Sequence, residues 1–125
     1  MEKQKRPVFL NLWQIRFPIT AIMSIMHRLS GVVLFLAIPL FIYALQQSLQ
    51  SEAGFQAAIH YADSVIIKVG LLIFAWSLLH HLLAGVRYLL LDVDFGIERT
   101  QARFSAWSVI ILTLILLLIF AGLFL

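Results

Sequence analysis

The sequence predicts an all-α integral membrane protein whose three transmembrane helices run up, down and up through the bilayer. Hydrophobic residues make up 62% of its 125 residues and charged residues only 12%, whereas a soluble domain has about 25% charged residues. The apolar residues gather in three runs, each long enough to cross a bilayer as a helix. We therefore expect a single membrane-anchor domain over residues 1–125, with no soluble catalytic domain and no activity from the chain alone.

Residues 1–17 are predicted to form a cytoplasmic, partly extended segment. Asn11, Gln14 and Arg16 interrupt its apolar residues, so we expect no cleavable signal peptide. The net charge of +3 comes largely from basic residues before the first span. These residues are typical of an orientation signal rather than of a nucleic-acid surface, so no nucleic-acid partner is expected.

The first span is predicted over about 18–46. Pro18 suits a first helical turn, where a missing N–H costs nothing. Pro39 is expected to kink the helix without breaking it, and Gln46 and Gln47 end the apolar run.

The second span is predicted over about 64–91, after a short amphipathic surface turn. Asp63 or Ser64 is a candidate N-cap. Lys68 and Arg87 bound the uncharged part of the span, and both are expected to snorkel to the interfaces. Gly96 is the expected C′ residue of this helix.

The third span is predicted over about 104–125, and its expected role is packing and anchoring. The N-terminal segment and the second connection carry Lys and Arg, and the first connection carries none. The positive-inside rule therefore places the N-terminus and the second connection in the cytoplasm.

A polar face stands where the first span enters the membrane. Thr20, Ser24, His27, Arg28 and Gly31 share one side of a helix. Polar and ionisable groups at that depth are costly, and this predicts a functional site.

The second span contains a histidine followed one turn later by a glycine, His81 and Gly85, on a face shared with Ser77 and Tyr88. Such a pair suits a flat macrocycle, with the imidazole on the iron and the glycine leaving room for the ring edge. The alternative is a hydrogen-bonded histidine that packs helices together. His80 points about 100° away and is assigned no role.

Depth separates the histidines in this interpretation. His27 and Arg28 are expected at the cytoplasmic rim, one to two turns shallower than His81. They could there meet haem propionates or a quinone head group. A second axial ligand would then come from another chain. The sequence has no cysteine, which excludes disulfides, thiolate zinc sites and cysteine-ligated iron–sulfur clusters within the chain.

Two motifs in this order resemble the cytochrome b membrane-anchor subunit of bacterial succinate dehydrogenase, the larger of two anchor chains. The first motif is Arg6-Pro7 followed by Ser24-x-x-His27-Arg28-x-Ser30-Gly31, and the second is His81-x3-Gly85-Val86-Arg87 with Asp92. The resemblance covers nearly the whole length. Tyr88 and Leu91 depart from the family's usual residues, which weakens any specific role for Tyr88.

The resemblance implies specific roles for several residues. His81 would be an axial ligand of one haem b per complex, shared with a histidine of the second anchor subunit. His27 and Arg28 would lie near the haem propionates. Ser24 and Arg28 would line the ubiquinone site, and Asp92 would lie near the quinone and haem region.

The resemblance also implies a setting. The partners would be a second membrane anchor, an iron–sulfur subunit and a flavoprotein, in the bacterial inner membrane, with ubiquinone as electron acceptor and lipid around the helices. Two alternatives stay open, a haem-free structural anchor and the anchor of a fumarate reductase. A transporter is disfavoured because three spans contain no inverted repeat.

Overall fold

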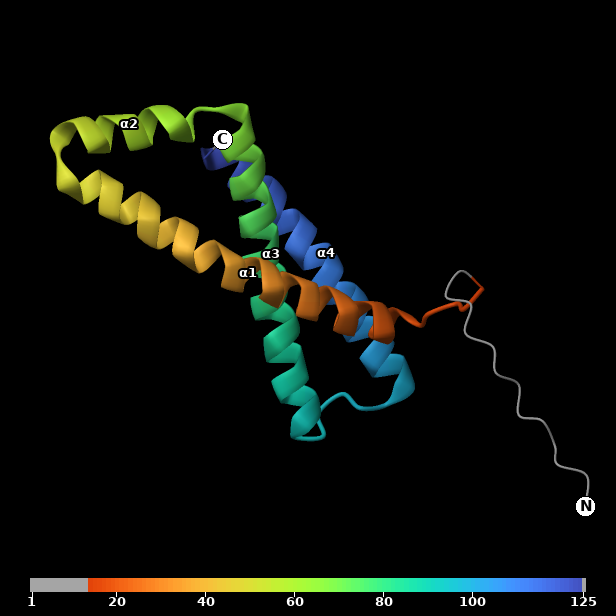
Figure 1. The fold of residues 1–125 in the computed structure, drawn as a ribbon. Helices are drawn as coiled ribbons and strands as arrows, with labels where there is room; N and C mark the ends of the chain where they lie inside the picture. Colours follow the sequence, from red (N-terminus) through yellow and green to blue (C-terminus); the bar gives the residue numbers. More distant parts are fainter. Residues whose placement is uncertain (1–13, 125) are drawn as a thin grey trace, which may run out of the picture.

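The fold of the chain, a computed structural model that describes residues 14–124, consists of helices joined by short connections (Figure 1). The helices are α1 (Ile19–Gln50), α2 (Glu52–Ala62), α3 (Val65–Asp92) and α4 (Arg99–Phe124). Helices α1, α3 and α4 are long and apolar enough to cross a membrane. The predicted all-α membrane fold with three spans is therefore confirmed. The Arg6-Pro7 motif lies outside the described residues.

Helix α1 begins directly after Pro18, whose carbonyl accepts hydrogen bonds from the backbone N–H groups of Ala21 (2.9 Å) and Ile22 (3.2 Å). The helix continues through Pro39 to Gln50, four residues beyond the predicted end of the span. Glutamine is a good helix former, and the polar residues therefore end the apolar run without ending the helix.

Helix α2 replaces the single amphipathic turn that was expected. Ser51 caps it, accepting a hydrogen bond from the Gly54 N–H at 3.0 Å. The helix spans the distance between the far ends of α1 and α3 (Figure 1). Ser64 is confirmed as the N-cap of α3, because its hydroxyl accepts the Ile67 N–H at 3.3 Å.

Helix α3 ends in a Schellman motif centred on Asp94, not on Gly96 as expected. The Asp94 N–H bonds the Leu91 carbonyl at 3.0 Å, and the Phe95 N–H bonds the Leu90 carbonyl at 2.9 Å. Asp94 has a φ of 61°, a left-handed conformation that aspartate tolerates better than most residues. Gly96 also has positive φ, at 77°, but lies in the loop beyond the helix end.

Helix α4 begins at Arg99, five residues before the expected start of the third span. Its first turns contain Gln101, Ala102 and Arg103, which are all strong helix formers. The helix therefore begins in the polar connection and continues into the apolar run.

The start of α1 lies at the same end of the molecule as the α3–α4 connection, and α2 and the end of α4 lie at the other (Figure 1). This arrangement agrees with the predicted up-down-up order. The core is small and lies where α1, α3 and α4 meet, with Met23, Ala84, Ala106 and Val109 buried. Most large apolar side chains are exposed, as expected for helices that face lipid or neighbouring subunits.

Helices α1 and α3 cross at Gly31. A Cβ atom added to Gly31 would lie 3.1 Å from Cε1 of His81, a distance shorter than ordinary van der Waals contact. A small residue at this crossing therefore allows the His81 ring to rest directly on α1.

We expect Gly31→Ala to destabilise the assembled complex by about 1–3 kcal/mol, because the added methyl group must displace the His81 ring or the helix. Thermal unfolding of the purified complex would measure the change. Gly70→Ala is the matched control, since a Cβ there meets nothing within 4 Å. A Gly31→Ala variant as stable as the Gly70→Ala variant would contradict the tight crossing.

Candidate functional site

The His81 imidazole is held against α1 through its Nδ1 atom. Nδ1 lies 3.1 Å from Oγ of Ser30 and 3.1 Å from the carbonyl oxygen of His27. The Ser30 hydroxyl donates its own proton to that same carbonyl at 2.8 Å. Both groups facing Nδ1 are therefore acceptors, and we assign the ring proton to Nδ1.

This tautomer leaves Nε2 of His81 with a free lone pair. Among residues 14–124, no hydrogen bond reaches Nε2, and the His81 side chain is only half-buried. A metal-ligating histidine typically donates its second ring N–H to a carbonyl or carboxylate, which orients the ring and raises its basicity. His81 thus has the support that an iron ligand needs.

No group of three or more His, Cys, Asp or Glu side chains in the described part of the chain could hold a metal ion. A single supported histidine fits an iron whose other ligands come largely from a macrocycle. The residues present therefore fit a haem.

The His27 ring stacks on the His81 ring, with centroids 4.1 Å apart and planes inclined by 9°. Tyr88 meets the edge of His27 at 5.2 Å. The expectation that His27 lies one to two turns shallower than His81 is therefore wrong. Helices α1 and α3 cross at a wide angle (Figure 1), so the distance of a residue from the helix end does not give its depth.

The stacked arrangement still argues against both rings binding one iron. Their faces are turned toward each other, whereas two axial ligands must point their nitrogens at the metal from opposite sides. Gly85 faces this pair, since a Cβ there would lie 3.7 Å from Nε2 of His27. That is ordinary van der Waals contact, so the His27 ring occupies the space beside Gly85.

His80 is enclosed within the helices, with no exposed surface. Its ring stacks on that of Trp76 at 5.3 Å, with planes 9° apart. Neither ring nitrogen has a hydrogen-bond partner among the described residues. The His80 ring is therefore closed to a ligand from outside the helices, whereas His81 is partly accessible.

The other predicted site residues, Ser24, Arg28 and Asp92, lie at different distances from His81. Ser24 is half-buried and Arg28 is exposed one turn later on α1, on the stretch that contacts His81. Asp92 is the exposed last residue of α3, eleven residues, or about 16 Å along the helix, from His81. The structure does not bring Asp92 to the histidines.

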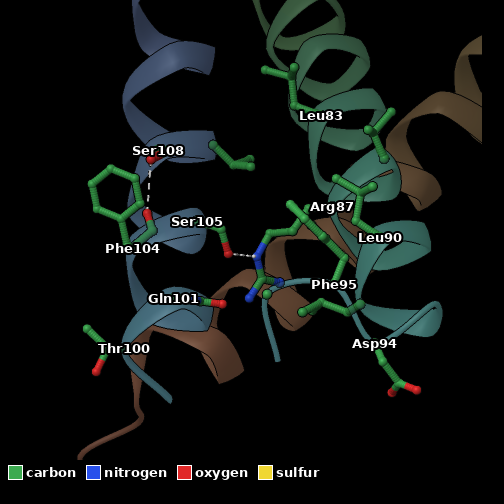
Figure 2. Close-up of a pocket in the computed structure, with 14 residues that line it drawn as sticks. Leu83, Arg87, Leu90, Asp94, Phe95, Thr100, Gln101, Phe104, Ser105 and Ser108 are labelled. Carbon is green, nitrogen blue, oxygen red and sulfur yellow. Dashed lines mark hydrogen bonds between the residues drawn. The ribbon is translucent and has the colours of Figure 1, made fainter. Parts of the chain in front are cut away.

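Arg87 does not snorkel to the interface as expected. It is only 6% exposed, and its Nε–H donates to Oγ of Ser105 at 2.9 Å (Figure 2). A terminal nitrogen donates to the Ala102 carbonyl, also at 2.9 Å. These bonds join α3 to the first turns of α4 and give two of the guanidinium N–H groups polar partners.

The sequence patterns did not predict that Ser30 contacts His81 or that Arg87 donates a hydrogen bond to Ser105. Ser30 stands three residues after His27 in the polar motif, and this spacing was the available signal. The hydrogen bond from Arg87 to Ser105 joins two helices, and no pattern within either helix predicts it.

Comparison of the sequence with known proteins identifies its family. The family described as succinate dehydrogenase/fumarate reductase transmembrane subunit matches residues 2–120. A succinate dehydrogenase cytochrome b556 subunit of Coxiella burnetii is 39% identical over 115 residues, which cover 89% of this chain and 90% of the relative. The subunit of that name from Paracoccus denitrificans is 33% identical, covering 96% of this chain and 98% of its own length.

The match spans nearly all of the chain, as the two motifs predicted. The three apolar helices and the bacterial relatives also support a multi-pass location in the inner membrane. The chain belongs to the family of succinate dehydrogenase and fumarate reductase transmembrane subunits.

Proposed function

We propose that this chain is the haem b-containing membrane anchor of a succinate dehydrogenase and that it helps to form the ubiquinone-reduction site. The observation that carries the proposal is the support of His81. Its Nδ1 proton faces two acceptors on α1, 3.1 Å away in each case, while Nε2 is free to bind iron.

His81 would hold the haem iron, and His27 and Arg28 would be close enough along α1 to meet the propionates. When bound, a haem b exchanges single electrons at a potential set by its ligands and their hydrogen bonds. Ser30 and the His27 carbonyl would fix the ring orientation of the ligand. The stacked His27 ring favours a second axial ligand from the partner anchor subunit.

Ser24 and Arg28 would bind the quinone. They lie one turn apart on α1, so a hydroxyl donor and a guanidinium point to the same side of the helix. Such donors stabilise the negative charge that develops on quinone oxygens during reduction. Electrons would come from an iron–sulfur subunit fed by a flavoprotein, and protons from cytoplasmic water. Asp92 is given no direct contact with haem or quinone, since it lies at an exposed helix end eleven residues from His81.

The family description covers both succinate dehydrogenases and fumarate reductases. The relatives named above are succinate dehydrogenase subunits, and they favour succinate oxidation as the direction for this chain.

We expect His81→Ala to abolish or shift the b-type band in the reduced-minus-oxidised spectrum of the purified complex, because the free Nε2 is lost. The adjacent His80→Leu is the matched control and should leave the band in place, since His80 is enclosed and unpaired. A band that survives in His81→Ala and disappears in His80→Leu would reverse the assignment. A wild-type complex without the band would favour a haem-free anchor.

We expect Ser30→Ala to raise the haem midpoint potential while haem is retained. Loss of one acceptor at Nδ1 lowers the basicity of the imidazole, and the oxidised iron is then less stabilised. Redox titration of the band would measure the shift. Ser30→Thr keeps the hydroxyl and is the control, and its haem midpoint potential should equal that of wild type. Equal midpoint potentials in Ser30→Ala and wild type would refute the role of Ser30.

We expect Arg28→Leu to lower succinate–quinone activity by about a hundredfold, the scale of losing one charge-stabilising donor. Succinate oxidation by a soluble dye should be unchanged, because that reaction does not need the quinone site. Lys68→Leu removes a cation near the other end of the bundle and is the control. Normal quinone reduction in Arg28→Leu would exclude Arg28 from the site.

A further inference from the structure

A cavity of about 750 Å³ lies between α3 and α4 and is closed at one end by their connection (Figure 2). It falls within the roughly 300–1,000 Å³ typical of small-molecule sites. Its lining comes from α3, α4 and the loop between them, and no residue of α1 contributes. His81 does not line it either, so the cavity is separate from the residues proposed to bind haem and quinone.

The inner part of the cavity is apolar. Its walls include Leu83, Val86, Leu90, Phe104 and Val109. Several of these side chains are exposed, with Phe104 at 74% and Leu90 at 44%, so the cavity is open at the side of the bundle. In a bilayer, this side faces acyl chains or a neighbouring subunit.

Arg87 supplies a buried positive charge to the same cavity. A guanidinium has five N–H donors, and two of them are used by Ser105 and the Ala102 carbonyl, which leaves three. No carboxylate of the described residues lies within 4.0 Å of Arg87, which instead has the Tyr88 ring at 5.4 Å. An anionic oxygen bound here would pair a charge that the chain leaves unpaired.

Asp94 brings a negative charge to the mouth of the cavity. It also lines the cavity, and in Figure 2 its carboxylate points away from the Arg87 guanidinium. The Schellman motif holds this residue at a φ of 61°, where glycine would be less strained. The Schellman motif therefore sets the backbone of Asp94, whose exposed carboxylate lies beside the loop.

We propose that this cavity binds an aminophospholipid from the cytoplasmic leaflet, with its phosphate on Arg87 and its ammonium group toward Asp94. Asp94 lies at the connection and Arg87 lies about two helical turns deeper, with apolar side chains between and beyond them. Basic pockets between helices at this face of a membrane are suited to lipid head groups. An anionic lipid without an ammonium group would also pair with the Arg87 guanidinium. It would, however, place its negative head group near the negative charge of Asp94.

Native mass spectrometry of the full, delipidated complex would test the proposal with phosphatidylethanolamine, phosphatidylglycerol and phosphatidylcholine of the same acyl chains. The wild-type complex should retain one more phosphatidylethanolamine molecule than the Arg87→Met complex. The variant should need about tenfold more lipid to half-fill the cavity, because it lacks one charge-assisted hydrogen bond. Ser105→Ala is the control for the helix contact alone and should still retain the lipid. Equal lipid retention in wild type and Arg87→Met would overturn the proposal.

Two further measurements separate the head-group contacts from a protein occupant. Asp94→Asn tolerates the left-handed conformation and removes the charge, so it should lose the preference for phosphatidylethanolamine over phosphatidylglycerol. An unchanged preference would refute the role of Asp94. The thiol of Ser108→Cys should react with a maleimide in the delipidated complex and be protected by added phosphatidylethanolamine. A thiol that never reacts would mean that a partner subunit fills the cavity, and the lipid proposal would fail.

Discussion

The hydrogen bonds between His81 and α1 are the interaction on which the candidate site depends. They need an acceptor pair from Ser30 and the His27 carbonyl, and they need α1 to approach without a side chain at Gly31. One helix crossing therefore determines the ring orientation, the tautomer and the nitrogen left free. The same crossing stacks the His27 ring on His81. Ser24 and Arg28 lie on the same part of α1 as His27.

The bilayer explains why polar groups in this protein are arranged in such different ways. Arg87 is buried, and hydrogen bonds to α4 offset part of the cost of its charge. The His80 ring stacks on Trp76, and neither of its nitrogens has a hydrogen-bond partner among the described residues. The small core formed by Met23, Ala84, Ala106 and Val109 is too limited to hide every apolar face, which agrees with an assembly completed by lipid and other subunits.

Several predictions differ from the structure because local sequence patterns do not contain the contacts between helices. The predicted spans follow the changes in polarity, whereas α1 continues to Gln50 and α4 already begins at Arg99, because helix propensity does not stop at the membrane boundary. Gly96 was expected to end α3, but Asp94 takes the left-handed position. Arg87 was expected at the interface, but its partners lie on another helix.

The sequence by itself determined the membrane class, the number of spans, their order and the polar motifs that mark the family. Those features depend on composition and on spacing along single helices, which are local properties. Only the tertiary structure decided that Ser30 supports His81, that His27 stacks on it, that His80 is enclosed and that Arg87 joins α3 to α4. Each of these depends on the angle and depth at which two helices cross. Residues such as Ser30 and Gly31 permit that geometry, but packing across the whole bundle selects it.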